Sequence, residues 1–174
     1  MNICRVLVVA ALAGPSASLY AQAPNDAQIA SIVVTANQVD INAGHLAETK
    51  GRSPEVKAFG KQMVTDHTGV NKQAANLVAK LGVKPEDNPT SQSLNSGGEE
   101  NVKRLRTLSG AAFDKAYIDH EVTYHQQVLD AMDKTLIPNA QNAELKGLLE
   151  KVRPAFAAHL EHARQLQGSL GGSK

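Results

Sequence analysis

Titratable side chains interrupt the apolar faces of four helical segments in this 174-residue chain. They are found by placing residues at 100° steps around each segment. Charged groups are almost never buried without a partner, because removing them from water is costly. Two carboxylates with three histidines form a ligand set that suits divalent iron, zinc, manganese or copper. The sequence therefore predicts a transition-metal site at Asp40, His67, Glu121, His125 and His159.

A metal-free interpretation of the same residues is also open. A single inward histidine is commonly a hydrogen-bonded core residue, and Asp40 could pair with a lysine or with His67. Glu121 and His125 are four residues apart, so they could form an ordinary pair on a helix surface. The metal hypothesis rests on the joint appearance of these groups on four segments. His159 is expected to lie furthest along the bundle from the others.

The pattern departs from that of di-iron bundles, which use Glu-x-x-His on two helices. No such motif occurs here, since Glu121 and His125 are one residue further apart and Asp66 directly precedes His67. A mononuclear site fits the ligand set better than a ferroxidase centre.

Apolar spacing and cap residues predict the first two helices. The first covers residues 26–50, and Gly51 is placed to end it in a left-handed conformation. Ser53 is a suitable N-cap for the second helix, with Pro54 at its first position. Leu81 is the expected last residue before a Gly–Pro-containing break.

Two further long helices are predicted in the second half of the chain. One covers residues 111–136 and ends at Pro138, and the next is capped by Asn139 and reaches Gln167. Pro154 is expected inside this last helix, because the apolar stripe continues on both sides of it.

The segment between the second and third long helices predicts a crossover. Residues 83–98 have the composition of a loop, followed by a short helix over residues 97–108 with Ser96 and Glu99 as a capping box. The predicted fold is all-α, a ferritin-like four-helix bundle with a long crossover between helices two and three. A plain up-down-up-down bundle is the alternative.

The N-terminus predicts export. Arg5 and the apolar run that follows it are typical of a secretory signal peptide over residues 1–21, rather than of an uncleaved anchor. Cleavage before Gln22 would leave a bundle domain over residues 26–168, a flexible tail over 169–174, and no cysteine. We therefore expect a periplasmic protein without disulfides or thiolate chemistry.

Composition argues against two classes of partner. Removing Arg5 takes the formal charge from +1 to 0, and the chain has three Phe, three Tyr and no Trp. Without a basic stripe or aromatic platforms, nucleic-acid binding has no support. No transmembrane segment is expected in the mature chain.

Three motifs resemble an exported bacterial family, domain of unknown function 4142. They are residues 56–67, the run from Phe113 to Ile118 with His125, and Pro154 with His159. The resemblance covers about residues 26–166 and implies a ferritin-like bundle in the periplasm or envelope, with no activity attached. It implies that His67, His125 and His159 are family positions and that Asp40 occupies a recurrent acidic position. Glu121 has no clear counterpart.

Overall fold

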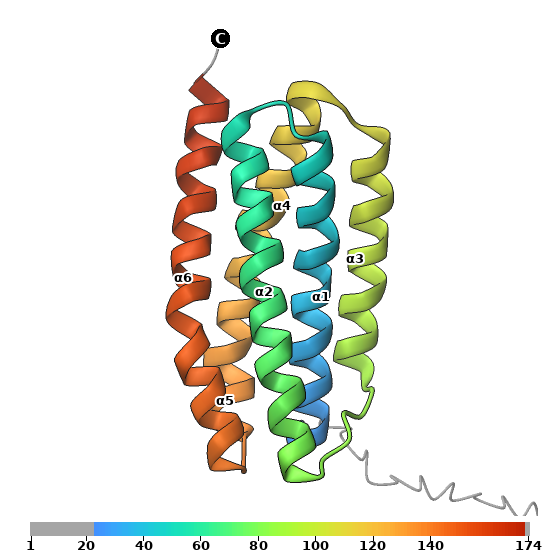
Figure 1. Cartoon of the computed structure of the whole chain (residues 1–174), viewed down its shortest axis with the longest axis vertical. Coiled ribbons are helices and arrows are strands. Elements are labelled where there is room, and N and C mark those ends of the chain that lie inside the picture. The colour runs from blue at the N-terminus through green and yellow to red at the C-terminus, as the bar shows by residue number, and fades with distance from the viewer. Residues whose placement is uncertain (1–22, 173–174) are drawn as a thin grey trace, which may run out of the picture.

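The computed structural model describes residues 23–172, and within them every regular element is a helix. The predicted signal peptide and the last two residues of the predicted tail lie outside this range. The long helices stand side by side (Figure 1). They are α1 (Asp26–Lys50), α2 (Pro54–Leu81), α3 (Pro89–Thr107), α4 (Gly110–Ala131) and α6 (Ala143–Gly172). A π-helix, η1 (Met132–Leu136), and the short α5 (Ile137–Asn139) connect α4 to α6.

The chain direction alternates from one long helix to the next. In Figure 1, α1, α3 and α6 run from the lower to the upper end, whereas α2 and α4 run downward. α1 packs along α2 and α3, and α4 packs along α6. α2 and α4 run in the same direction, and α3 connects them by returning the chain along the length of the bundle. The predicted crossover is present, and it is helical over nearly its whole length.

Two aspartates fasten the ends of the bundle. The carboxylate of Asp26 accepts hydrogen bonds from the backbone N–H groups of Gln141 and Asn142 at 2.8 and 2.9 Å. At the opposite end, the buried carboxylate of Asp114 accepts from the N–H groups of Arg52 and Ser53, both at 2.8 Å. Because each turn is held by a helix distant in sequence, the helices are kept in register along their length.

The loop prediction for residues 83–98 is wrong beyond Asn88. The side chain of Asn88 caps α3 and forms a reciprocal capping box with Ser91, with Pro89 in the first helical turn. The helix therefore has 19 residues, and Ser96 lies inside it instead of capping it. α3 is hard to detect because it lies on the outside of the bundle and buries few apolar side chains. Its close approach to α1 depends on Gly98, where a Cβ would lie 2.6 Å from Val39 Cγ2.

Four smaller boundary predictions also need correction. Gly51 ends α1 but has φ −51°, so it is not left-handed; a Cβ there would lie 2.6 Å from the carbonyl oxygen of Ala47. The third long helix widens into the π-helix η1 before residue 136. Asn142, not Asn139, accepts hydrogen bonds from the first N–H groups of α6. α6 contains Pro154, as predicted, and continues past Gln167 to Gly172.

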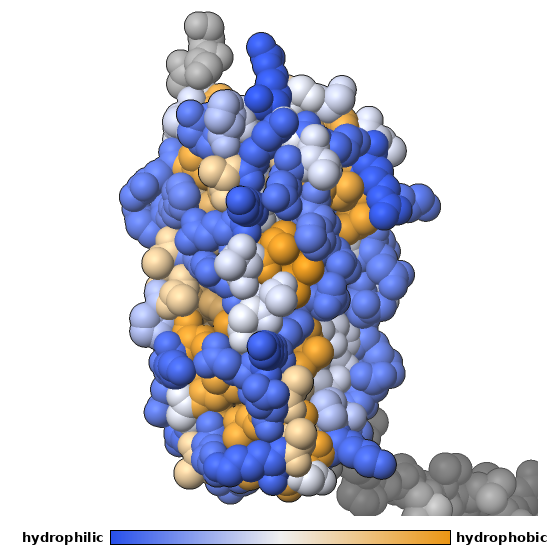
Figure 2. Space-filling view, viewed as in Figure 1, coloured by the Kyte–Doolittle hydropathy of each residue, from blue (hydrophilic) through white to orange (hydrophobic). Residues whose placement is uncertain are grey.

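The apolar core is divided into two clusters along the bundle axis. One contains Ile29, Val70, Leu129 and Phe156, and the other contains residues such as Met63 and Phe113. The face seen in Figure 2 is mainly hydrophilic, with apolar residues exposed among the hydrophilic ones. None of the helices within residues 23–172 is long and apolar enough to cross a membrane.

Gly44 of α1 and Gly60 of α2 let these two helices pack closely together. A Cβ on Gly60 would lie 2.7 Å from Ala47 Cβ and 2.8 Å from the carbonyl oxygen of Gly44. Gly69 is on the same helix, but a Cβ there would meet nothing within 4 Å. An alanine at position 60 therefore tests helix packing, whereas an alanine at position 69 tests helix propensity alone.

We expect Gly60→Ala to destabilise the protein by about 1–3 kcal/mol, because the added methyl group must push the helices apart. Gly69→Ala should instead stabilise it by roughly 0.5–1 kcal/mol, because alanine favours the helical backbone. Urea unfolding of both variants measures the difference. Equal effects of the two substitutions would contradict the close approach of α1 and α2.

Candidate metal centre

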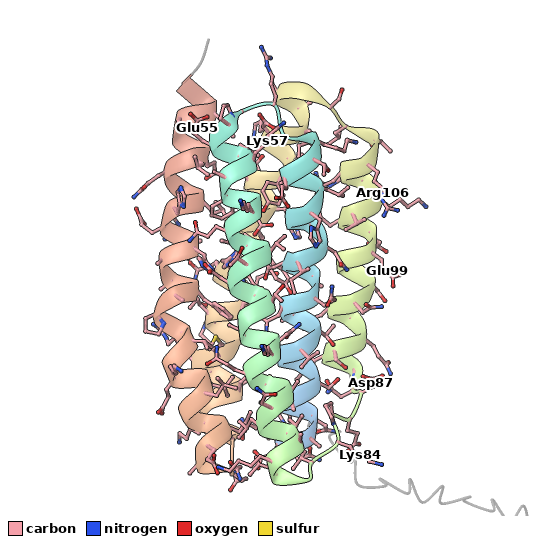
Figure 3. The ribbon with its side chains drawn as sticks, in the orientation of Figure 1. Glu55, Lys57, Lys84, Asp87, Glu99 and Arg106 are labelled. Carbon is pink, nitrogen blue, oxygen red and sulfur yellow. The ribbon has the colours of Figure 1, made fainter. Side chains whose placement is uncertain are left out.

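The structure brings the five candidate residues together in the middle of the bundle, between the two apolar clusters. α1 carries Asp40, α2 carries His67, α4 carries Glu121 and His125, and α6 carries His159. All five are at most 2% exposed. Ordinary charged residues behave differently: Figure 3 shows labelled side chains such as Glu99 and Arg106 on the outside of α3. The prediction that these five side chains face the inside of the bundle is therefore confirmed.

Asn37 fixes the orientation of the His67 ring. Its amide nitrogen donates to the carbonyl oxygen of Val33 at 2.9 Å, which leaves its Oδ1 to face His67 Nδ1 at 2.7 Å. An amide oxygen only accepts hydrogen bonds, so Nδ1 of His67 carries the proton. The other nitrogen, Nε2, is buried without a hydrogen-bond partner.

The other two histidines follow the same arrangement. Nδ1 of His125 lies 3.1 Å from the backbone carbonyl oxygen of Glu121, and Nε2 of His159 lies 2.9 Å from a carboxylate oxygen of Asp66. Both acceptors call for an N–H on the facing ring nitrogen. The remaining nitrogens, His125 Nε2 and His159 Nδ1, are again buried without a partner. Metal-ligating histidines are typically held in this way by an acceptor on the far nitrogen.

The three imidazole rings form a compact triangle. Their centroids are 5.6 Å apart for His67–His125, 5.4 Å for His67–His159 and 5.5 Å for His125–His159. One ring nitrogen from each histidine lies within 4.8 Å of one from each of the others. Phe156 covers the triangle, with centroid distances of 4.9 to 6.4 Å to the three rings. The expected offset of His159 along the bundle is wrong, because its ring is level with the other two.

The two carboxyl groups lie against this triangle. Oδ2 of Asp40 is 3.5 Å from the free Nε2 of His67, and Oε2 of Glu121 is 3.3 Å from Nδ1 of His125. Asp40, Glu121 and His125 form a second group whose ligand atoms lie within 4.8 Å of one another. Oδ1 of Asp40 and both carboxylate oxygens of Glu121 have no hydrogen-bond partner. A cation in this cluster would balance the negative charge of these carboxylates and could give Asp40 the partner that it lacks.

Burial and mutual charge shift the pKa values in opposite directions. Burial raises the pKa of Asp40 well above its usual value. Burial and the neighbouring His125 and His159 lower the pKa of His67 well below 6.5, and burial also lowers that of His159. Burial alone would lower the pKa of His125 too, but the charges of Asp40 and Glu121 raise it to about 9. His67 and His159 are therefore neutral at pH 7, whereas His125 holds a proton beside the carboxylates.

Several residues around the cluster are not predicted by the sequence. Asn37 does not titrate, so a search for acids and bases misses it. The hydroxyl of Tyr117 is buried without a partner, and burial and the charges of Glu121 and Asp40 raise its pKa. His120 is half-buried and stacks on Tyr124 at 5.4 Å, although its wheel position points outward. Asp66, which accepts the hydrogen bond from His159, lies at the margin of the apolar stripe of α2. This marginal position is the only indication of its role in the sequence.

Fold and site together define a helical bundle with a buried histidine–carboxylate cluster that could hold a metal ion. The chain belongs to the family described as domain of unknown function DUF4142, whose model matches residues 11–166. The resemblance of the sequence motifs to this family is thereby confirmed. The search of curated proteins and the search of solved structures each gave no match.

The protonation of His125 predicts how stability depends on pH in the absence of metal. A histidine whose pKa is raised from 6.5 to about 9 stabilises the fold below pH 6.5, and this contribution is lost as pH rises to 9. We expect a loss of about 3 kcal/mol over this interval, from the linkage between pKa and stability. Chemical denaturation of the metal-free protein at pH 6.5, 8 and 9 measures it.

His125→Gln should flatten this alkaline dependence, because glutamine does not titrate. His45→Gln provides the control, since His45 is exposed on α1. The interpretation fails if the wild-type protein is equally stable at pH 6.5 and 9, or if both variants keep the wild-type slope.

Proposed function

We propose that this protein binds one divalent transition-metal ion between α1, α2, α4 and α6. The observation that carries the proposal is the state of the three histidine rings. Each has one nitrogen held by an acceptor and the other buried without a partner. The ligands would be His67 Nε2, His125 Nε2 and His159 Nδ1, with Asp40 as the fourth because its carboxylate lies beside the free nitrogen of His67.

Charge balance supports a divalent cation. Asp40 and Glu121 supply two negative charges in a region closed to solvent, and three neutral imidazoles supply none. A doubly charged ion makes the cluster neutral overall, which removes the cost of an uncompensated buried charge. Glu121 would act from behind His125, where its carboxylate faces the ring nitrogen that does not bind the metal. Nitrogen and oxygen donors of this kind suit zinc, iron, manganese and copper.

The arrangement of the helices supports a ferritin-like bundle as the finer description of the fold. Ferritin-like bundles have one long crossover between their second and third core helices. Here α3 makes that crossover, and the proposed ligands come from facing helices of the bundle core. Two carboxylates and no Glu-x-x-His motif favour one ion over a di-iron centre. The function that follows is metal binding or metal handling in the cell envelope.

The envelope location depends on export. Residues 1–21 have the pattern of a cleaved signal peptide, so the mature chain should begin at Gln22. Intact-mass measurement on a periplasmic extract tests this. Recovery of only the full-length chain, in the membrane fraction, would contradict export.

Calorimetric titration with Zn²⁺ tests the proposed site. We expect one ion per chain and a higher melting temperature in its presence, because a ligand of the folded state stabilises that state. His67→Ala with His125→Ala should abolish tight binding. Asp66→Ala should weaken it by about 10–100-fold, the usual effect of removing a partner that orients a ligand.

His45→Ala is the matched control, because it removes an exposed histidine from α1 and should leave Zn²⁺ binding unchanged. A structural or adaptor role without metal predicts a different result. In that case the cluster variants would lower stability, and no saturable binding of one ion would be seen in the wild-type protein.

A further inference from the structure

A hollow lies next to the histidine cluster. It has a volume of about 630 Å³. It is lined by residues of α1, of the start of α3, of α4 with the π-helix η1, and of α6. Its walls carry apolar side chains, among them Ile32, Val33, Val128, Met132, Leu136 and Val152. The volume is within the range of about 300–1,000 Å³ that small-molecule sites occupy.

The described part of the chain offers no charge to a ligand in the hollow. Among residues 23–172, no Asp, Glu, Lys, Arg or His side chain lines it. Its deep polar groups are already paired: Asn37 uses both ends of its amide, and the hydroxyl of Tyr124 donates to the carbonyl oxygen of Ala36 at 3.1 Å. None of the described buried polar atoms that lack a partner belongs to its lining. A charged or strongly polar ligand would lose its hydration there without compensation.

The wall of the hollow has an unusual backbone. The π-helix η1 replaces regular α-helix where Met132, Thr135 and Leu136 line the hollow. π-helical turns are rare and occur frequently at functional sites. The distortion is confined to the part of the chain that shapes the hollow, which is an observation independent of the apolar lining.

From these features we propose that the hollow is a binding site for an uncharged, hydrocarbon-rich small molecule. Such a ligand would lie against Phe156, the residue that also covers the three histidine rings. Apolar contact with the walls would supply the affinity, because the buried polar groups of the lining, Asn37 and Tyr124, are already paired. The proposal does not depend on the metal, since none of the candidate ligands lines the hollow.

Methionine NMR tests the proposal without a mutation. Met132 lines the hollow, whereas Met63 is buried in the other apolar cluster. Titration with N-phenyl-1-naphthylamine, an uncharged aromatic fluorophore, should shift the ¹³C-methyl signal of Met132 in a saturable way and leave Met63 unmoved. Equal shifts of both signals, or no saturation, would overturn the proposal.

A cavity-filling variant gives a second test. Ala131→Trp places an indole in the hollow and should weaken fluorophore binding at least tenfold. Ala112→Trp adds the same group to an exposed position of α4 and should bind as the wild type does. The proposal fails if the folded Ala131→Trp protein keeps wild-type affinity. If that variant does not fold, the Met132 signal alone decides.

Discussion

Two carboxyl groups buried at the centre of a helical bundle set the constraint on which the rest of the structure depends. Asp40 and Glu121 are closed off from solvent, so their negative charge must be matched by protons or by a cation. Without metal, protons do this: the pKa of Asp40 rises through burial, and the carboxylates raise that of His125 to about 9. A metal ion would replace these protons and engage the three ring nitrogens that otherwise have no partner.

The architecture serves to hold this polar layer in place. Each of the four helices that meet at the cluster supplies at least one of its residues, so a shift of one helix by a single turn would disperse it. The carboxylates of Asp26 and Asp114 fix the two ends of the bundle, and Gly44 and Gly60 let α1 and α2 approach closely. Apolar clusters on both sides of the layer then exclude water from it.

The sequence predicts those features that have a local signal. α1 and α2 have the predicted bounds, because cap residues such as Ser53 and Gly82 act within one turn of the chain. The five candidate residues are found because acids and bases stand out in an apolar stripe. The first part of α3, before residue 97, is missed because the helix buries few apolar side chains. The π-helix η1 is missed because no residue pattern distinguishes a π-helix from an α-helix. The position of His159 along the bundle axis and the role of Asn37 depend on how the helices pack against one another. The sequence of a single helix does not show this.

The most direct measurement of the central claim is anomalous diffraction at the zinc edge from crystals of the Zn²⁺-loaded protein. The account predicts one strong peak in the bundle core, about 2.0–2.1 Å from a ring nitrogen of each of His67, His125 and His159. A peak only at surface positions such as His45, or none within the bundle, would contradict it.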